Sequence, residues 1–204
     1  MAFDTNVFVN CPFDEAYYPL LRPLLFTIIY ARLQPRIALE AADAGEARLE
    51  KIIGLIRESK FGIHDLSRCK ASVAGEFYRM NMPFELGVDF GCRKFGHGHL
   101  RQKKMLILET EPHRYKAALS DLAGADIEAH GDEPYRVISV VRNWLRTAGV
   151  QNPPGPAKIS GAFTDFMAEN FDALTEQGFS PADIKALPIA ELTAYMRNWV
   201  EGNA

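Results

Sequence analysis

The sequence of 204 residues has few cysteines and little net charge. The three cysteines are odd in number and widely spaced, which is typical of reduced thiols in a cytoplasm. The net charge of −3 provides no global basic field, which argues against nucleic acid as a partner. No spacing of cysteine and histidine resembles a zinc site, so we expect no bound metal.

Long hydrophobic runs are also missing. The longest apolar stretch, residues 20–31, carries Arg22, Pro23 and Thr27 and is too short to span a bilayer. Residues 1–4 have neither the basic region nor the apolar run of a signal peptide. We therefore expect a cytoplasmic protein that does not contact a membrane.

The common phosphate-binding motifs are absent as well. There is no P-loop, and no G-x-G-x-x-G segment follows an expected strand. The run Gly-Cys-Arg-Lys-Phe-Gly at residues 91–96 does not match that pattern. This argues against a Rossmann dehydrogenase.

The pattern that is present is an alternation of strands and helices. With 48% hydrophobic and 24% charged residues, the chain suits one globular domain with a full core and an appendage. Short apolar runs predict strands at residues 6–10, 36–40, 61–66, 104–109 and 125–129. Apolar residues at helical spacing lie between them, including a short helix at residues 115–122. Five repeats of this alternation predict an α/β fold with a five-stranded parallel sheet and helices on both faces.

The commonest order for such a sheet is 2-1-3-4-5, which places a ligand crevice where the first and third strands end. The loops at this point are residues 10–14 and 65–70.

A proline-rich segment separates this region from the rest of the chain. Residues 150–158 contain Asn-Pro-Pro-Gly-Pro, which is typical of a stiff linker. Beyond it, residues 159–204 predict a helical hairpin, with Ser180 as an N-cap and Pro181 in the first turn of its helix. Such a hairpin is too small to fold well alone, so it packs on the domain at residues 1–149 or on a second copy. Four aromatic residues suit either arrangement: Phe163, Phe166, Phe171 and Trp199. We expect a homo-oligomer.

The most informative segment is residues 81–87, Asn-Met-Pro-Phe-Glu-Leu-Gly. It places Glu85 at the opening of an amphipathic helix, where the helix N-terminus is expected to keep the carboxylate ionised. A carboxylate beside a sugar can bind its hydroxyls and can stabilise positive charge on the anomeric carbon. The alternative is structural, since an acid in a first helical turn also interacts with the helix dipole.

Further candidates lie in the loops beside the crevice. Asp65 is a possible second acid or the cap of a turn, and the neighbouring His64 is a ligand or a packed imidazole. Asn10 is a candidate for binding an amide or a hydroxyl, and Phe13 for stacking on a flat base or for packing in the core. Cys11 has the position of a nucleophile, but no histidine partner for it is evident from the sequence.

Phosphate binding needs a separate set of residues. Ser67 is a candidate for a phosphate or for a bond within its own loop, and Asn81 is a further candidate binding residue. Four arginines are candidate phosphate partners: Arg36, Arg48, Arg68 and Arg79. Each of them is more often a solvated surface charge, and of the four we select Arg68 only.

The segments at residues 7–14, 61–68 and 81–87 resemble bacterial TIR-like proteins, in the group that joins TIR domains and nucleoside 2-deoxyribosyltransferases. The resemblance covers residues 5–147 and implies a flavodoxin-like three-layer sandwich for residues 1–149. It implies that Glu85 is the catalytic glutamate, which in TIR enzymes supports cleavage of NAD between nicotinamide and ribose. In deoxyribosyltransferases the glutamate is a nucleophile and an aspartate assists the base, which is the role that Asp65 would take.

Three hypotheses about function follow. The first is an NAD glycohydrolase or ADP-ribose cyclase, with NAD as substrate and no cofactor, in the setting of anti-phage defence or signalling that bacterial TIR proteins often serve. The second is a nucleoside or nucleotide N-glycosidase or deoxyribosyltransferase, which needs Asp65 as well as Glu85. The third is a non-catalytic module that binds a nucleotide or assembles with partners.

Overall fold

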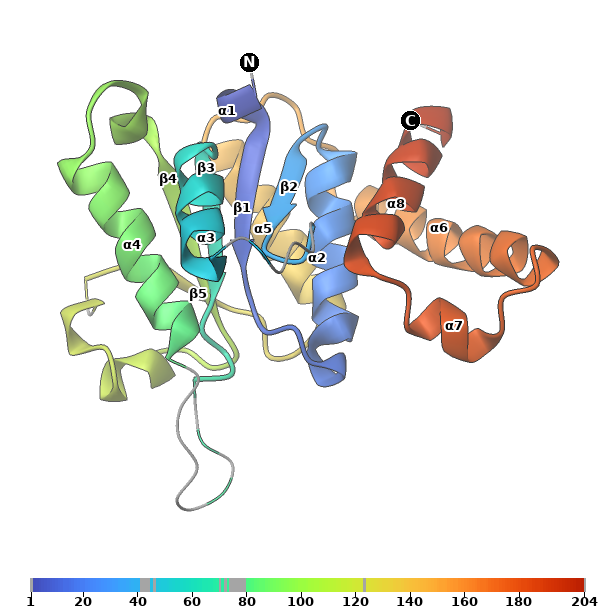
Figure 1. The fold of residues 1–204 in the computed structure, drawn as a ribbon, viewed down its shortest axis with the longest axis horizontal. Helices are drawn as coiled ribbons and strands as arrows, with labels where there is room; N and C mark the ends of the chain where they lie inside the picture. The colour runs from blue at the N-terminus through green and yellow to red at the C-terminus, as the bar shows by residue number, and fades with distance from the viewer. Residues whose placement is uncertain are drawn as a thin grey trace.

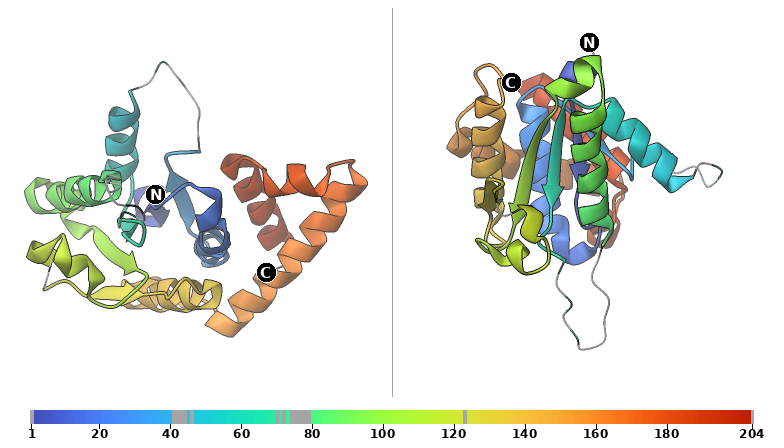
Figure 2. Two further views of the ribbon diagram at one scale, coloured as in Figure 1. Left: turned by 90° about the horizontal axis from the view of Figure 1, so that it is seen from below. Right: turned by 90° about the vertical axis from the view of Figure 1, so that its left-hand side faces the viewer.

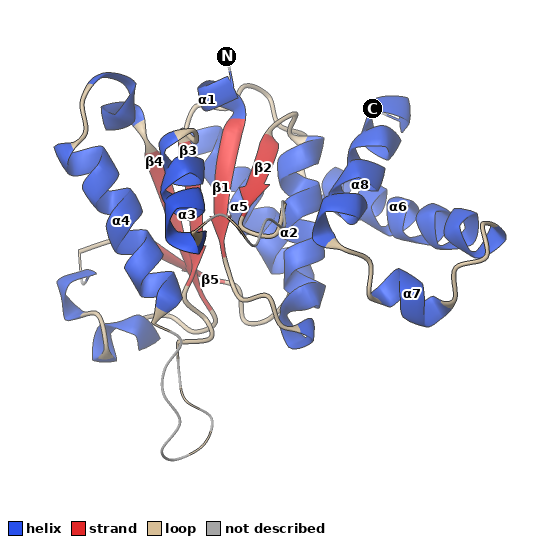
Figure 3. Cartoon of the chain, in the orientation of Figure 1, coloured by secondary structure: helices blue, strands red, loops and turns tan. Residues whose placement is uncertain are grey.

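Five parallel strands form the centre of the computed structural model, which describes residues 2–40, 45, 47–69, 71, 73, 80–122 and 124–203. The strands are β1 (Asn6–Asn10), β2 (Gln34–Ile37), β3 (Phe61–Asp65), β4 (Lys104–Glu109) and β5 (Ile127–Ala129). Their order is β2-β1-β3-β4-β5, and each neighbouring pair is parallel (Figures 1 and 3). The predicted flavodoxin-like α/β sandwich with order 2-1-3-4-5 is therefore confirmed.

Helices cover both faces of this sheet. Helices α2 (Tyr18–Tyr30) and α5 (Pro134–Thr147) lie on one face, and α3 (Arg48–Arg57) and α4 (Asn81–Phe95) lie on the other (Figure 2). The short elements are α1 (Ala2–Thr5) and the 3₁₀ turns η1 (Glu15–Tyr17), η2 (Gly98–Gln102), η3 (Arg114–Ala117) and η4 (Ser120–Leu122).

The alternation of side chains along β1 and β3 determines which groups reach which face. Val7 and Val9 belong to the large core cluster with α2 and α5, whereas Phe8 packs on α3. Because successive side chains in a strand point to opposite faces, Asn10 shares the face of Phe8. Ile63 of β3 belongs to the cluster with α2 and α5, so the adjacent His64 lies on the face covered by α4.

Several elements differ from the sequence prediction. Strand β3 ends at Asp65 instead of Leu66, and β5 begins at Ile127 instead of Ala125. Strand β2 spans Gln34–Ile37 instead of residues 36–40, and it includes Pro35. Proline is tolerated there because β2 is the edge strand of the sheet, where a missing N–H breaks no ladder on the open side. The helix expected at residues 115–122 is replaced by the turns η3 and η4.

The C-terminal region consists of three helices instead of a two-helix hairpin. They are α6 (Pro156–Glu176), α7 (Pro181–Lys185) and α8 (Ile189–Asn203). Helix α6 begins inside the predicted linker because Pro156 is suited to a first helical turn. The predicted start of α7 is confirmed, since Ser180 forms a reciprocal capping box with Asp183.

These helices pack against α2 of the α/β domain. The ring of Phe26 on α2 lies 5.4 Å from Phe163, 5.5 Å from Phe166 and 5.9 Å from Trp199, between ring centroids. Phe166 is fully buried, whereas Phe171 is 40% exposed. Three of the four aromatic residues therefore continue the core of the first domain. In the part of the chain described here, no helix has the length and apolar character needed to cross a bilayer.

Candidate active site

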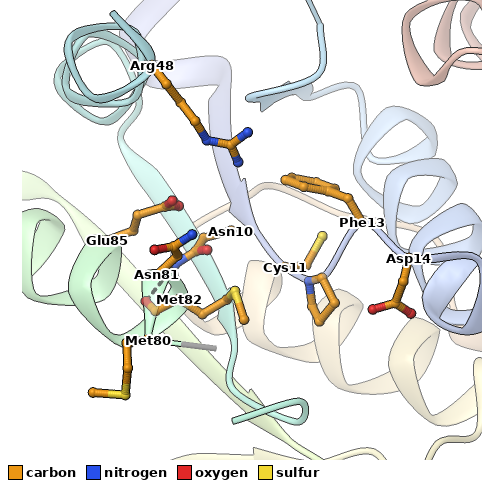
Figure 4. A pocket seen from close by; sticks show the side chains of 10 residues that line it. Asn10, Cys11, Phe13, Asp14, Arg48, Met80, Asn81, Met82 and Glu85 are labelled. Atoms are coloured by element: carbon orange, nitrogen blue, oxygen red, sulfur yellow. Dashed lines mark hydrogen bonds between the residues drawn. The ribbon is translucent and has the colours of Figure 1, made fainter. Parts of the chain in front are cut away.

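A cavity of about 530 Å³ opens at the carboxyl end of β1, between the loop that follows β1 and the first turns of α3 and α4 (Figure 4). Ten described residues line it: Asn10, Cys11, Pro12, Phe13, Asp14, Arg48, Met80, Asn81, Met82 and Glu85. The cavity lies at the crevice that the strand order predicted, on the side of β1. Its walls bring together four of the seven predicted site residues: Asn10, Phe13, Asn81 and Glu85.

Glu85 reaches the cavity from the second turn of α4, because the helix begins at Asn81. Its side chain is largely buried, with 8% of the residue exposed. Burial raises the pKa of Glu85 to about 7, and the positive charge of Arg48 acts in the opposite direction. The expectation that the helix N-terminus keeps this carboxylate ionised is therefore wrong: loss of water has the larger effect.

Arg48 and Phe13 define other walls of the cavity. Figure 4 shows the guanidinium of Arg48 and the carboxylate of Glu85 pointing into the same space, with the ring of Phe13 facing it from the loop after β1. Phe13 is half-buried and packs against the large core cluster, which confirms the predicted packing role, whereas stacking on a base stays a prediction. Among the described lining residues, Arg48 carries the positive charge.

The arginine selected from the sequence lies elsewhere. Arg68 Nη1 is 3.4 Å from Asp132 Oδ2, and Arg68 is not among the residues that line the cavity. Arg36 pairs with Glu40 and Glu58. Arg79 lies outside the described residues. Of the four candidate arginines, Arg48 is the one that the described structure places at the cavity.

Asp65 does not line the cavity either. Asp65 lies two residues after Ile63 in β3, so its side chain points to the same face of the sheet, the one covered by α2 and α5. It is fully buried there. Tyr17 Oη donates to Asp65 Oδ2 at 2.5 Å, the backbone N–H of Ser67 donates to Oδ1 at 2.8 Å, and His130 Nε2 lies 3.1 Å from Oδ2. Burial alone would raise the pKa of Asp65, but His130 and the bonds from Ser67 and Tyr17 hold it below its usual value. These contacts join the loops that follow β1, β3 and β5.

Two other candidates have clear positions. Ser67 is buried and is not among the residues that line the cavity, and its backbone N–H donates to Asp65 Oδ1. Cys11 does line the cavity, but it is 2% exposed. Burial and the nearby charges of Asp65 and Glu85 raise the pKa of the Cys11 thiol well above its usual value. A thiol without thiolate character is a poor nucleophile.

Sequence reasoning missed Asp89 and Lys103, which are fully buried and do not line the cavity. One signal was available: Asp89 lies one helical turn after Glu85, on the side of α4 that otherwise carries apolar residues. Among the residues that the structure describes, no three His, Cys, Asp or Glu side chains lie close enough together to hold a metal ion.

Comparison of the chain with protein-family models, curated proteins and solved structures found no match.

Proposed function

We propose that this chain cleaves the N-glycosidic bond between nicotinamide and ribose in NAD or a related pyridine nucleotide. The observation that carries the proposal is the position of Glu85, whose carboxyl group lines a cavity at the carboxyl ends of a parallel sheet and is shielded from water. Ligands of doubly wound sheets bind at this edge. A volume of about 530 Å³ falls within the range of small-molecule sites.

Cleavage of the nicotinamide–ribose bond requires only one ionised carboxylate in the site. The nicotinamide ring of NAD is a pyridinium and leaves as a neutral molecule, so its departure needs no proton donor. The bond breaks with its electron pair going to the ring nitrogen, and positive charge develops on the ribose. Ionised Glu85 stabilises that charge, and burial of the side chain strengthens the effect, because little water screens the carboxylate.

The protonation state of Glu85 fits this role when the substrate is bound. With a pKa of about 7, roughly half of the carboxyl groups are ionised at neutral pH. A bound pyridinium places a positive charge close to the carboxylate and favours its ionised form. Arg48 acts in the same direction.

The remaining walls supply binding groups. Phe13 offers a flat surface for an aromatic base, and Arg48 offers a guanidinium for the phosphate groups. After nicotinamide leaves, water attacks the ribose in a hydrolase, and an internal group of the nucleotide attacks it in a cyclase. The resemblance to TIR-like proteins supports NAD as the substrate, and with it a role in anti-phage defence or signalling.

A nucleoside N-glycosidase or deoxyribosyltransferase is the second candidate. The raised pKa of Glu85 favours it, because a protonated carboxyl group can donate to a departing base. Its expected second acid, Asp65, is bound in the network with Tyr17 and His130 away from the cavity. NAD cleavage requires one acidic residue in the cavity, whereas the second candidate requires two.

The test is to incubate the purified protein with NAD and, separately, with a panel of ribonucleosides and deoxyribonucleosides, and to identify the products by mass. We expect nicotinamide with ADP-ribose or its cyclic form, and intact deoxynucleosides. Cleavage of deoxynucleosides with intact NAD would favour the second candidate. Binding of NAD without any product would instead indicate a nucleotide-binding module.

A further inference from the structure

A chain of buried polar side chains runs from the cavity into the core. The side-chain nitrogen of Asn10 lies 3.1 Å from His64 Nδ1, and His64 Nε2 lies 3.0 Å from Asp89 Oδ2. The other oxygen of Asp89 lies 3.2 Å from the ammonium of Lys103. Asn10 is 3% exposed, and His64, Asp89 and Lys103 are fully buried. Such a set of groups is stable only when their charges and hydrogen bonds are matched.

The backbone of β1 and β3 leaves space for this series of buried polar side chains. Asn10 and His64 are register partners on the adjacent strands β1 and β3, so their side chains lie next to each other on one face. Gly62 lies two residues before His64 in β3 and so on the same face, and a Cβ at Gly62 would lie 2.3 Å from Asp89 Oδ2 and 3.0 Å from His64 Nε2. A side chain at position 62 would therefore overlap Asp89, and glycine allows the contact between His64 and Asp89 to form.

The hydrogen bonds determine the orientation of the Asn10 amide. Asp89 faces the Lys103 cation as a carboxylate, which only accepts, so His64 Nε2 carries the proton of that contact. The NH₂ group of Asn10, which only donates, faces His64 Nδ1, so Nδ1 is the acceptor in that contact. The same NH₂ group donates to the carbonyl oxygen of Met82 at 2.9 Å. Two independent acceptors thus fix the NH₂ end of the amide toward the protein.

The opposite end of the amide is left for a ligand. Both hydrogens of the Asn10 NH₂ group are used, and Asn10 Oδ1 has no hydrogen-bond partner among the described residues. Asn10 and Glu85 both line the cavity. A carbonyl oxygen and a carboxylate in one cavity are both acceptors, and a sugar with adjacent hydroxyls is a neutral ligand that can donate to both.

We propose that Asn10 is a specificity-determining residue, whose Oδ1 accepts a hydrogen bond from a hydroxyl of the ribose beside Glu85, and that His64 and Asp89 are positioning residues that fix this oxygen toward the cavity. The site then selects a ribose with both hydroxyls over a deoxyribose. This inference rests on the proposed binding of a ribonucleotide in the cavity, and it does not depend on cleavage.

The test measures binding instead of turnover. Isothermal titration calorimetry would compare ADP-ribose with its analogues that lack the 2-hydroxyl or the 3-hydroxyl of the terminal ribose. For the wild-type protein we expect at least one analogue to bind about tenfold more weakly, since one hydrogen bond is lost. In Asn10→Ala that difference should disappear. Equal binding of all three ligands by the wild-type protein, a difference that persists in Asn10→Ala, or no binding of any of them would overturn the proposal.

A second variant tests the positioning role and leaves Asn10 in place. In Asp89→Asn the amide oxygen turns to the Lys103 cation and its NH₂ group turns to His64 Nε2. His64 then carries its proton on Nδ1, which calls for the oxygen of Asn10 in place of its NH₂ group. Discrimination between ADP-ribose and the analogue should fall at least threefold. The matched control is Asp132→Asn, at an aspartate whose side chain is exposed to solvent.

Full discrimination in Asp89→Asn would overturn the positioning role of His64 and Asp89. A protein that shows the predicted binding pattern but releases no nicotinamide would support this inference and contradict the proposed cleavage. The two proposals can therefore fail separately.

Discussion

Asp65 and Glu85 lie on opposite faces of the parallel sheet: Asp65 contacts Tyr17 on the side of α2, and Glu85 extends from α4 into the cavity. Their environments act on their pKa values in opposite directions. Partners hold the pKa of Asp65 below its usual value, whereas burial raises that of Glu85 to about 7. One carboxylate is thus part of the structural framework, and the other faces the ligand space.

The first prediction concerns the stability of Glu85→Gln. Between pH about 4.5 and 7 the folded protein keeps a proton on Glu85 that the unfolded chain has released, so wild-type stability falls as pH rises through this window. Glutamine is always neutral and avoids this loss. We expect the variant to be more stable than the wild type at pH 8, by at most about 3 kcal/mol, and equal to it at pH 4. Urea denaturation at both pH values measures this, and lower stability of the variant at pH 8 would contradict the burial of Glu85.

The second prediction is a pH profile of cleavage. Because the ionised form of Glu85 stabilises the ribose cation, kcat/KM for NAD should rise with pH through about 7 and level off above it. Initial rates of nicotinamide release between pH 5.5 and 9 measure the profile. A rate that falls through the same range would indicate that Glu85 acts as a proton donor.

The third prediction separates two arginines. Arg48→Ala removes the charge that lowers the pKa of Glu85, so the midpoint of the pH profile should move upward. We also expect about tenfold weaker binding of ADP-ribose, because a guanidinium contact to phosphate is lost. The matched control is Arg68→Ala, since Arg68 does not line the cavity. Equal effects of the two substitutions would remove Arg48 from the site.

The fourth prediction tests whether the fold tolerates a side chain at Gly62. A Cβ there would overlap Asp89 Oδ2, so Gly62→Ala should lower the free energy of unfolding by about 1–3 kcal/mol. The control is Gly54→Ala in α3, where, apart from the adjacent residues and the backbone of the helix itself, no heavy atom lies within 4 Å of the added Cβ. Alanine favours a helix over glycine, so this control should gain about 0.5–1 kcal/mol. A Gly62→Ala protein as stable as the wild type would show that the contact between His64 and Asp89 is not tight.

The fifth prediction concerns Asp65→Asn. The contacts with His130, Ser67 and Tyr17 stabilise ionised Asp65, so the variant should lose about 2–3 kcal/mol at pH 7. Because the pKa of Asp65 is lowered in the folded state, the advantage of the wild type is present above pH about 4 and is lost as pH falls further. Nicotinamide release should remain within about threefold of the wild type at a temperature where both proteins are folded. A loss of activity comparable to that of Glu85→Gln would place Asp65 in the reaction.

The sheet could be predicted from the sequence because each strand and helix leaves a local signal. Strand order and the location of the cavity followed from the alternation of these elements. The predicted bounds of β2 were wrong because proline usually interrupts a strand, and the sequence does not show that β2 lies at the edge of the sheet, where Pro35 is tolerated.

The site could be predicted only in part. Residues of β1 and β3 are buried on both faces, so no alternation of polar and apolar residues shows which side chains share a face. That is why Asp65 was selected, although it points away from the cavity, and why the relation between Asn10 and His64 was missed. The choice between Arg48 and Arg68 depends on the packing of α3 beside α4, which is not a property of either segment alone.

The most direct test of the central claim is the release of nicotinamide from NAD by the wild-type protein and by Glu85→Gln, measured by mass at pH 8. Both proteins should bind ADP-ribose and be folded at the assay temperature. The account predicts release by the wild type and at least a hundredfold lower rate in the variant, because a neutral amide cannot stabilise the ribose cation as a carboxylate does. Equal rates in the two proteins would contradict it.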